Sequence, residues 1–102
     1  MAYEYEITDI ALEEIDSAVK YILNFFSNKK AATDLLDEIE KSINNICDYP
    51  FSYPDCSYYY VKDKNIRHSI IKNYVLIYKI DDKKITFLRF KHSKQNIISL
   101  EK

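Results

Sequence analysis

The stretch KNYVLIYKID, residues 72–81, decides the expected fold, because aromatic and β-branched side chains fill its middle and polar residues bound it. Such a run is typical of a β-strand. Comparable stretches flank it, and together they predict strands at residues 58–61, 66–71, 74–80 and 85–90. Short polar breaks separate these strands, so we expect hairpins between them. Since the chain contains no glycine, the turn residues with positive φ should be Asn or Asp.

Two amphipathic helices are predicted before these strands. Thr8 supplies an N-cap side chain, Asp9 places negative charge in the first turn, and apolar residues recur at Leu12, Ile15, Val19, Ile22 and Phe26. Residues 27–30 interrupt this pattern, and a second apolar stripe follows at Ala32, Leu35, Leu36, Ile39, Ile43 and Ile46. Because Pro50 and Pro54 then prevent further helix, we expect two antiparallel helices followed by a loop.

The first residues complete the predicted architecture. Residues 3–7 alternate aromatic and acidic side chains, as a half-exposed strand does. The whole chain of 102 residues, with 47% hydrophobic content, suits one compact domain spanning 1–102. The predicted fold class is therefore α+β: a two-helix antiparallel hairpin packed on one face of a mostly antiparallel twisted sheet, in the order β-α-α-β-β-β(-β).

Composition argues against several functional classes. No apolar stretch is long enough for a membrane span, and the N-terminus lacks the pattern of a secretory signal, so we expect a cytoplasmic protein with no membrane partner. Cys47 and Cys56 do not have the spacing of a zinc site, and in the cytosol they are expected to be buried or idle thiols. Since the chain also has no phosphate-binding glycine loop, neither a metal nor a cofactor is expected.

The net charge of -1 conceals a strong polarity along the chain. Residues 1–60 contain four basic and twelve acidic residues, a net charge of -8, whereas residues 61–102 contain eleven basic and four acidic residues, a net charge of +7. One interpretation is a basic surface on the late strands for an acidic partner or a phosphate backbone. The other is that the two halves neutralise each other across the fold.

Several short strings resemble the RelE/ParE superfamily of toxins, and the resemblance covers nearly the whole chain. They are Ala31-Ala32 with Ile39, Ile43 and Ile46; Tyr49-Pro50-Phe51 followed by Pro54; Ile66-Arg67; the run 72–81; and residues 88–96. The last two are similar to the NYLIFY and RxxHxxQ/RD signatures of ParE-like and plasmid-stabilisation toxins. The resemblance implies a cytoplasmic toxin that is neutralised by a cognate antitoxin, with operator DNA reached only through that antitoxin.

The resemblance leaves the target open between two branches. ParE-type members bind and poison DNA gyrase, whereas RelE-like members cleave mRNA in the ribosome. In the mRNA-cleaving members a catalytic arginine stands where this chain has Val75, and a functional tyrosine lies near the C-terminus, where this chain has Ile97-Ile98-Ser99-Leu100. Both departures favour gyrase. A further alternative is an inactive homologue kept for antitoxin binding and autoregulation.

If the chain is an endoribonuclease, three residues are the candidates for its chemistry. His92 can move a proton near neutral pH, and Arg67 and Arg89 can clamp a phosphate. Target or nucleic-acid binding is expected from Lys62, Lys64, Lys91, Lys94 and Gln95. Structural alternatives exist for each catalytic candidate: Arg89 can pair with an acid of the helices, His92 can cap a strand end, and Arg67 can belong to a solvated strand face.

The acids of the predicted helices are interpreted as a solvated surface. They are not expected to act as paired catalytic carboxylates, and they include Glu13, Glu14, Asp37, Glu38 and Glu40.

Overall fold

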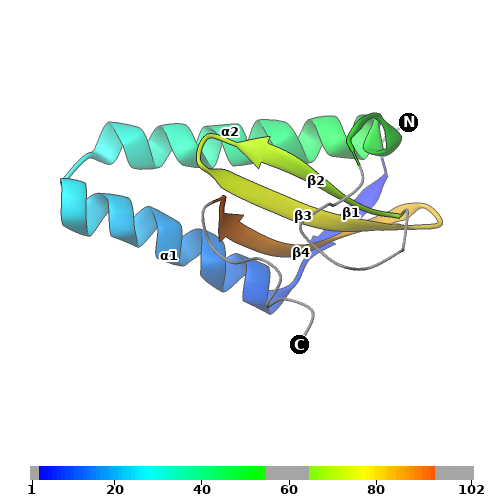
Figure 1. The fold of residues 1–102 in the computed structure, drawn as a ribbon, viewed down its shortest axis with the longest axis horizontal. Coiled ribbons are helices and arrows are strands. Elements are labelled where there is room, and N and C mark those ends of the chain that lie inside the picture. The colour runs from blue at the N-terminus through cyan, green and yellow to red at the C-terminus, as the bar shows by residue number, and fades with distance from the viewer. Residues whose placement is uncertain (1–2, 55–64, 94–102) are drawn as a thin grey trace.

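The computed structural model describes residues 3–54 and 65–93 of the chain. The elements are β1 (Glu4–Ile7), α1 (Asp9–Phe26), α2 (Lys29–Asp48), a short 3₁₀ helix η1 (Pro50–Ser52), β2 (Ile66–Ile71), β3 (Tyr74–Asp81) and β4 (Lys84–His92) (Figure 1). Two helices and a sheet of four strands confirm the predicted α+β class. The strand predicted at residues 58–61 and Cys56 lie outside the described residues.

Side-chain caps set the start of both helices. The Thr8 side chain accepts a hydrogen bond from the Ala11 N–H at 3.1 Å, as predicted, and the Asn28 side chain accepts one from the Ala31 N–H at 3.0 Å. Each bond satisfies a backbone donor that has no partner inside its helix. Between the helices Ser27 adopts the left-handed conformation with φ 47°, which reverses the chain and produces the antiparallel hairpin (Figure 1).

The sheet has the strand order β1-β4-β3-β2. β2, β3 and β4 form the predicted antiparallel meander, while β1 joins β4 in parallel. β1 pairs with residues 84–87, so within residues 3–54 and 65–93 no strand pairs with the second half of β4 on that side. That uncovered edge is where α1 begins, and it positions the candidate site described below.

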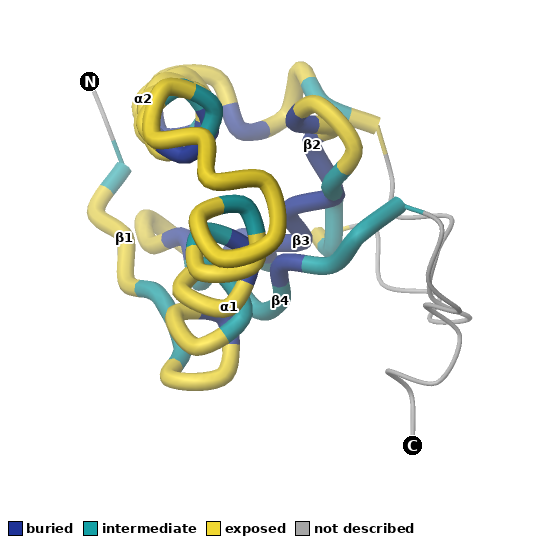
Figure 2. The backbone as a smooth tube through the Cα atoms, turned by 90° about the vertical axis from the view of Figure 1, so that its left-hand side faces the viewer, coloured by how far each residue is buried: buried dark blue, intermediate teal, exposed yellow. Residues whose placement is uncertain are grey.

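The core lies between the helices and one face of the sheet. Leu35, Ile39, Ile43 and Ile46 of α2 are buried against residues of the last three strands that include Ile71, Leu76, Tyr78, Ile80, Ile85 and Phe87. Figure 2 shows these strands mostly buried or half-buried, with the helices exposed on their outer sides. The hydroxyl of the fully buried Tyr78 donates to the Pro50 carbonyl at 2.7 Å, which satisfies it and ties η1 to the core.

Two expectations about individual positions were wrong. In the turn between β2 and β3, positive φ belongs to Lys72 (54°) and not to Asn73, although Asp82 (φ 49°) takes that role in the next turn, as expected. On α1, Ile15, Val19 and Ile22 pack against the core, but Leu12 and Phe26 of the predicted stripe are 49% and 63% exposed. Phe26 ends α1, which extends past the strands there (Figure 1), whereas Leu12 follows the fully buried Ala11, which takes the inward position in that turn.

Candidate functional site

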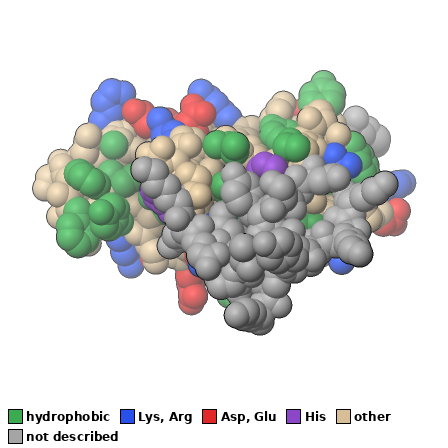
Figure 3. Space-filling view, viewed as in Figure 1, with side chains coloured by type: hydrophobic (Ala, Val, Ile, Leu, Met, Phe, Trp, Pro, Cys, Tyr) green, Lys and Arg blue, Asp and Glu red, His purple; other side chains and the backbone are tan. Residues whose placement is uncertain are grey.

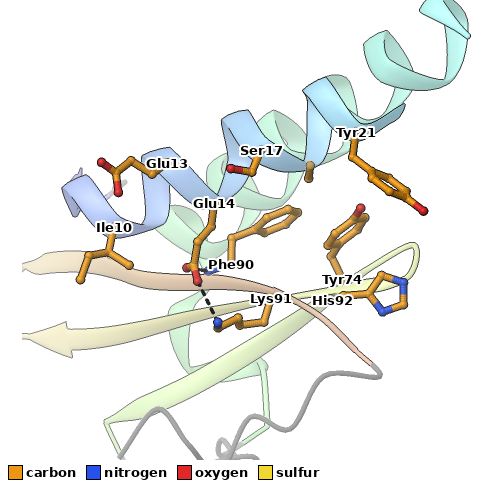
Figure 4. Close-up of a pocket in the computed structure, with 10 residues that line it drawn as sticks. Ile10, Glu13, Glu14, Ser17, Tyr21, Tyr74, Phe90, Lys91 and His92 are labelled. Carbon is orange, nitrogen blue, oxygen red and sulfur yellow. Dashed lines mark hydrogen bonds and ion pairs between the residues drawn. The ribbon is translucent and has the colours of Figure 1, made fainter. Parts of the chain in front are cut away.

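A groove runs between α1 and the C-terminal half of β4. Its volume is about 690 Å³, within the range of ligand-binding clefts. Figure 4 shows the side chains that point into it from α1, from the start of β3 and from the end of β4. The lining residues are Ile10, Glu13, Glu14, Ser17, Ala18, Tyr21, Tyr74, Phe90, Lys91 and His92.

The groove exists because, in the described part of the chain, α1 and not a further strand lies beside the second half of β4. The Thr8 N–H donates to the Phe87 carbonyl at 3.0 Å, and the Thr8 hydroxyl donates to the Leu88 carbonyl at 2.9 Å. One turn and a half further along α1, the Glu14 carboxylate accepts a hydrogen bond from the Phe90 N–H at 2.9 Å. Thr8, which caps α1, and Glu14 within it therefore satisfy backbone groups of β4 that a neighbouring strand would otherwise bond.

Glu14 is the electrostatic centre of the groove. Arg89 donates to it in a two-point contact, with Nε to Oε1 at 3.0 Å and Nη2 to Oε2 at 2.8 Å, and Lys91 Nζ lies 3.2 Å from Oε2. Burial by itself raises the pKa of Glu14, but the hydrogen bonds from Arg89, from the Phe90 N–H and from Lys91 outweigh it and hold that pKa below its usual value. Glu14 is therefore a carboxylate at neutral pH.

This arrangement corrects the expectation that Glu14 belongs to a solvated helix surface. Its side chain is only 17% exposed. The sequence held a signal for this, because Glu14 lies three residues after Ala11 and four before Ala18, the two buried residues of α1. For Arg89, the structural alternative of a partner on the helices is confirmed.

Aromatic side chains form the other end of the groove. The rings of Tyr74 and Phe90 stack with centroids 4.8 Å apart, and His92 meets Tyr74 edge-on at 5.2 Å. Burial and the neighbouring Tyr21 raise the pKa of Tyr74. A second cavity of about 370 Å³ shares Tyr21, Tyr74 and His92 with the groove and continues toward Phe26 and Lys72. The two hollows therefore adjoin around one cluster of aromatic rings.

Arg67 lies elsewhere on the sheet. It donates to the carbonyls of Phe51 and Tyr53 at 3.3 and 2.5 Å, and its guanidinium lies 5.2 Å from the centre of the Phe51 ring. Across the sheet Arg67 is opposite Tyr78, whereas His92 is opposite Tyr74, four residues away on β3. That separation is about 13 Å along the strand. The structure therefore does not bring Arg67 and His92 to one point.

The remaining predicted site residues divide into two groups. Lys91 lines the groove, where it is paired with Glu14. Lys62, Lys64, Lys94 and Gln95 lie outside the described residues.

Among the described residues, ion pairs join Lys84 to Glu6, and Arg89 and Lys91 to Glu14, so basic residues of the late strands meet acids of the N-terminal half. For these cations the expected basic surface is therefore replaced by mutual neutralisation of the two halves.

Within residues 3–54 and 65–93 no group of three His, Cys, Asp or Glu side chains is placed to hold a metal ion. Neither helix of this described part is long and apolar enough to cross a membrane. Cys47 is buried, and burial raises the pKa of its thiol.

Several solved structures with a similar fold come from toxin–antitoxin systems. A chain of the chromosomal ParDE system from P. aeruginosa aligns with a TM-score of 0.69 at 11% identity, over 91% of this chain and 98% of that one. A chain of the RelBE2 complex from Mycobacterium tuberculosis aligns with a TM-score of 0.60 at 19% identity, covering 90% and 99%. A chain of the E. coli DinJ-YafQ complex gives 0.61 at 16% identity, covering 90% and 93%. The TM-scores show a similar fold, and at such low sequence identities the similarity concerns the fold alone.

Sequence comparison supplies the family. No curated protein matches the chain closely enough to serve as a relative. The profile of one family, described as the ParE toxin of the type II toxin–antitoxin system parDE, matches residues 5–97. The match covers both helices and, apart from Glu4 at the start of β1, all four strands of the structure. The chain belongs to the ParE toxin family of type II toxin–antitoxin systems.

Proposed function

We propose that this toxin acts in the cytoplasm by binding and inhibiting DNA gyrase, and that a cognate antitoxin neutralises it. One observation carries the choice of gyrase over mRNA: the three residues predicted for nuclease chemistry do not converge. Arg89 is held by Glu14, and Arg67 is held by loop carbonyls. His92 lies four register positions along β3 from Arg67.

Chemistry explains why this separation counts against RNA cleavage. Attack of a 2′-hydroxyl on the neighbouring phosphate needs an acid, a base and cations around one phosphorus atom. To reach a phosphate, Arg89 would have to leave a two-point contact with a carboxylate that is 17% exposed. Breaking such a partly buried pair costs on the order of 1–3 kcal/mol. Inhibition by binding needs no such rearrangement.

The groove between α1 and β4 is the surface that we propose for the antitoxin. Its aromatic end can accept apolar side chains, and Lys91 and His92 lie beside that end (Figure 4). A fitting segment is amphipathic, because it covers the apolar rings at one end of the groove and meets the Glu14–Lys91 pair at the other. In this proposal operator DNA is contacted by the antitoxin and not by the toxin.

Expression of the chain without its antitoxin tests the choice of target. We expect growth arrest with early loss of DNA synthesis and accumulation of gyrase-linked broken DNA. The variant His92→Ala should arrest growth as the wild type does, because His92 has no chemical step to perform. Abrupt arrest of translation with cuts in mRNA, abolished by His92→Ala, would replace gyrase by the ribosome. Normal growth of cells that contain folded wild-type protein would identify an inactive homologue.

A further inference from the structure

The end of the helical hairpin exposes a cluster of aromatic rings. We call residues 20–30, which close α1, form the turn and open α2, the hairpin tip. Phe25 and Phe26 are 73% and 63% exposed, and Tyr21 is 50% exposed. The Tyr21 ring contacts both phenylalanine rings, at centroid distances of 4.7 and 5.6 Å. Exposed aromatic groups of this kind mark binding surfaces, because water solvates them poorly.

The hairpin tip is also a basic segment within the otherwise acidic N-terminal half of the chain. Residues 17–33 contain three lysines and no acid, although residues 1–60 contain twelve acids in all. Lys20 and Lys30 form exposed ion pairs with Asp16 and Asp34, each one helical turn away from the tip. Exposed pairs of this type contribute little and exchange readily with other partners. The tip therefore combines apolar rings with positive charge available to an acidic partner.

The shape of the tip distinguishes it from the groove. Figure 1 shows the turn between α1 and α2 extending past the ends of the strands. Figure 3 shows hydrophobic side chains gathered at that same end of the molecule. A protruding knob of rings fits a concave pocket on a folded protein, whereas an extended peptide segment needs a hollow such as the groove beside β4.

We propose that the hairpin tip is the surface with which the toxin docks into its protein target, inserting Phe25 and Phe26 into an apolar pocket with an acidic rim. This inference rests on the proposed function, since it assigns that target a place on the toxin. It divides the molecule between two partners: the antitoxin in the groove, and the target on the tip. Phe26 also lines the second cavity, which links the two surfaces.

Charge and composition disfavour other occupants of the tip. A second copy of the chain would bring its three tip lysines close to the same three lysines, which repel each other. Single-stranded nucleic acid is usually bound with arginine and stacked rings along a groove, whereas the tip protrudes and has no arginine. An apolar protein pocket with an acidic rim can bury the aromatic rings and pair with the lysines.

The test uses the full chain with two substitutions matched for exposure. Phe26→Ser alters the tip, and Ile70→Ser alters a β2 side chain that is also 63% exposed. A double variant, Phe25→Ser with Phe26→Ser, removes both rings. Each protein is measured for growth arrest on induction, for gyrase-dependent DNA cleavage in vitro and for co-purification with the antitoxin. Circular dichroism and thermal unfolding establish that each variant is folded.

We expect the double variant to lose gyrase-dependent cleavage by about 30-fold or more and to permit growth, because buried aromatic anchors dominate binding energy. Ile70→Ser should retain cleavage within about twofold, and all variants should still co-purify with the antitoxin. Unchanged toxicity of a folded double variant overturns the tip as docking surface while leaving gyrase as the target.

Two further outcomes separate this inference from the proposed function. Loss of growth arrest in the double variant, with a wild type that does not affect gyrase, would retain the tip and replace the target. Binding of the wild type to phosphatidylglycerol vesicles or to a single-stranded oligonucleotide, abolished in the double variant, would overturn a protein pocket as the occupant. Association of wild-type chains that Phe26→Ser abolishes in sedimentation would do the same in favour of a dimer.

Discussion

The two helices of the hairpin are of similar length and both carry many apolar residues, yet they use them differently. α2 buries Ala32, Leu35, Ile39, Ile43, Ile46 and Cys47, and Leu36 is its one large hydrophobic residue that is markedly exposed. α1 buries only Ala11 and Ala18, and it exposes Ile10, Leu12, Tyr21, Leu23, Phe25 and Phe26. We conclude that α2 forms the core of the fold, whereas much of the apolar surface of α1 is available to partners.

The two helices also differ in the kind of contact that holds each of them to the sheet. α2 is held chiefly by hydrophobic burial across the sheet, which is non-directional, with hydrogen bonds at Ser42 and Cys47 in addition. The first half of α1 is held to the edge of β4 by directional contacts, namely the bonds of Thr8 to Phe87 and Leu88 and those of Glu14 to Arg89 and Phe90. Such contacts fix the position of α1 and leave its outer face free of a structural role. Substitutions in α1 and α2 can therefore compare how much each kind of contact contributes to the free energy of unfolding.

The largest loss of stability is expected from a cavity under α2. Leu35 is 1% exposed, so Leu35→Ala removes its side chain from a closed core. We expect the free energy of unfolding to fall by about 2–5 kcal/mol. Urea denaturation followed by circular dichroism measures it. A loss below about 1 kcal/mol would show that α2 is not the principal core helix.

The next largest effect is expected where α1 is attached electrostatically. Glu14→Gln keeps the shape of the side chain but leaves Arg89 and Lys91, which are 23% and 22% exposed, without their carboxylate. We expect a loss of about 1–3 kcal/mol in the free energy of unfolding. Glu13→Gln, at the neighbouring exposed position, is the control and should change stability by less than about 0.5 kcal/mol. Equal effects of the two substitutions would remove the special role of Glu14.

The same carboxylate predicts how stability depends on pH. Burial opposes its charge, but hydrogen bonds from Arg89, Phe90 and Lys91 place the folded-state pKa of Glu14 below the ordinary value of 4.5. Its contribution is therefore complete above pH 4.5 and is lost as the pH falls through the folded-state pKa. The difference in unfolding free energy between wild type and Glu14→Gln should narrow from about pH 6 to about pH 3. A difference that stays constant over this range would contradict the assignment.

A smaller effect is expected at the start of α1. Thr8→Ala removes the cap bond from the Ala11 N–H and the bond to the Leu88 carbonyl. We expect a loss of about 1–2 kcal/mol, near the upper end of values for helix caps because two bonds are lost. Asn28→Ala at the cap of α2, which breaks one such bond, should cost about half as much. Denaturation of both variants under identical conditions makes the comparison, and a larger loss at Asn28 would reverse it.

Local sequence signals sufficed for most of the fold. The Thr8 cap, the stripe of α2 and the three late strands follow from interactions between residues close in sequence, where spacing determines which side chains share a face. The parallel pairing of β1 with β4 joins residues about 80 positions apart, and no local pattern specifies it. Lys72 was missed because residue type favoured the neighbouring Asn73, whereas the structure gives the positive φ to position 72 of this turn.

The candidate site was less accessible to prediction for the same reason. Arg89 and Glu14 are 75 residues apart, so their pairing depends on α1 lying along the edge of β4. The sequence indicated which residues were chemically capable, namely Arg67, Arg89 and His92, but not that strand register would separate Arg67 from His92. Lys62, Lys64, Lys94 and Gln95 stay predictions.

The smallest effect is expected from a substitution that matches Leu35→Ala in chemistry but lies on the other helix. Leu12 is 49% exposed, so Leu12→Ala removes a side chain that is already half in water. Alanine also has the higher helix propensity, which offsets part of the lost contact. We expect the free energy of unfolding to change by less than about 0.5 kcal/mol, measured as for Leu35→Ala. If Leu12→Ala instead costs as much as Leu35→Ala, the apolar face of α1 contributes to the fold after all, and its exposure no longer argues for partners.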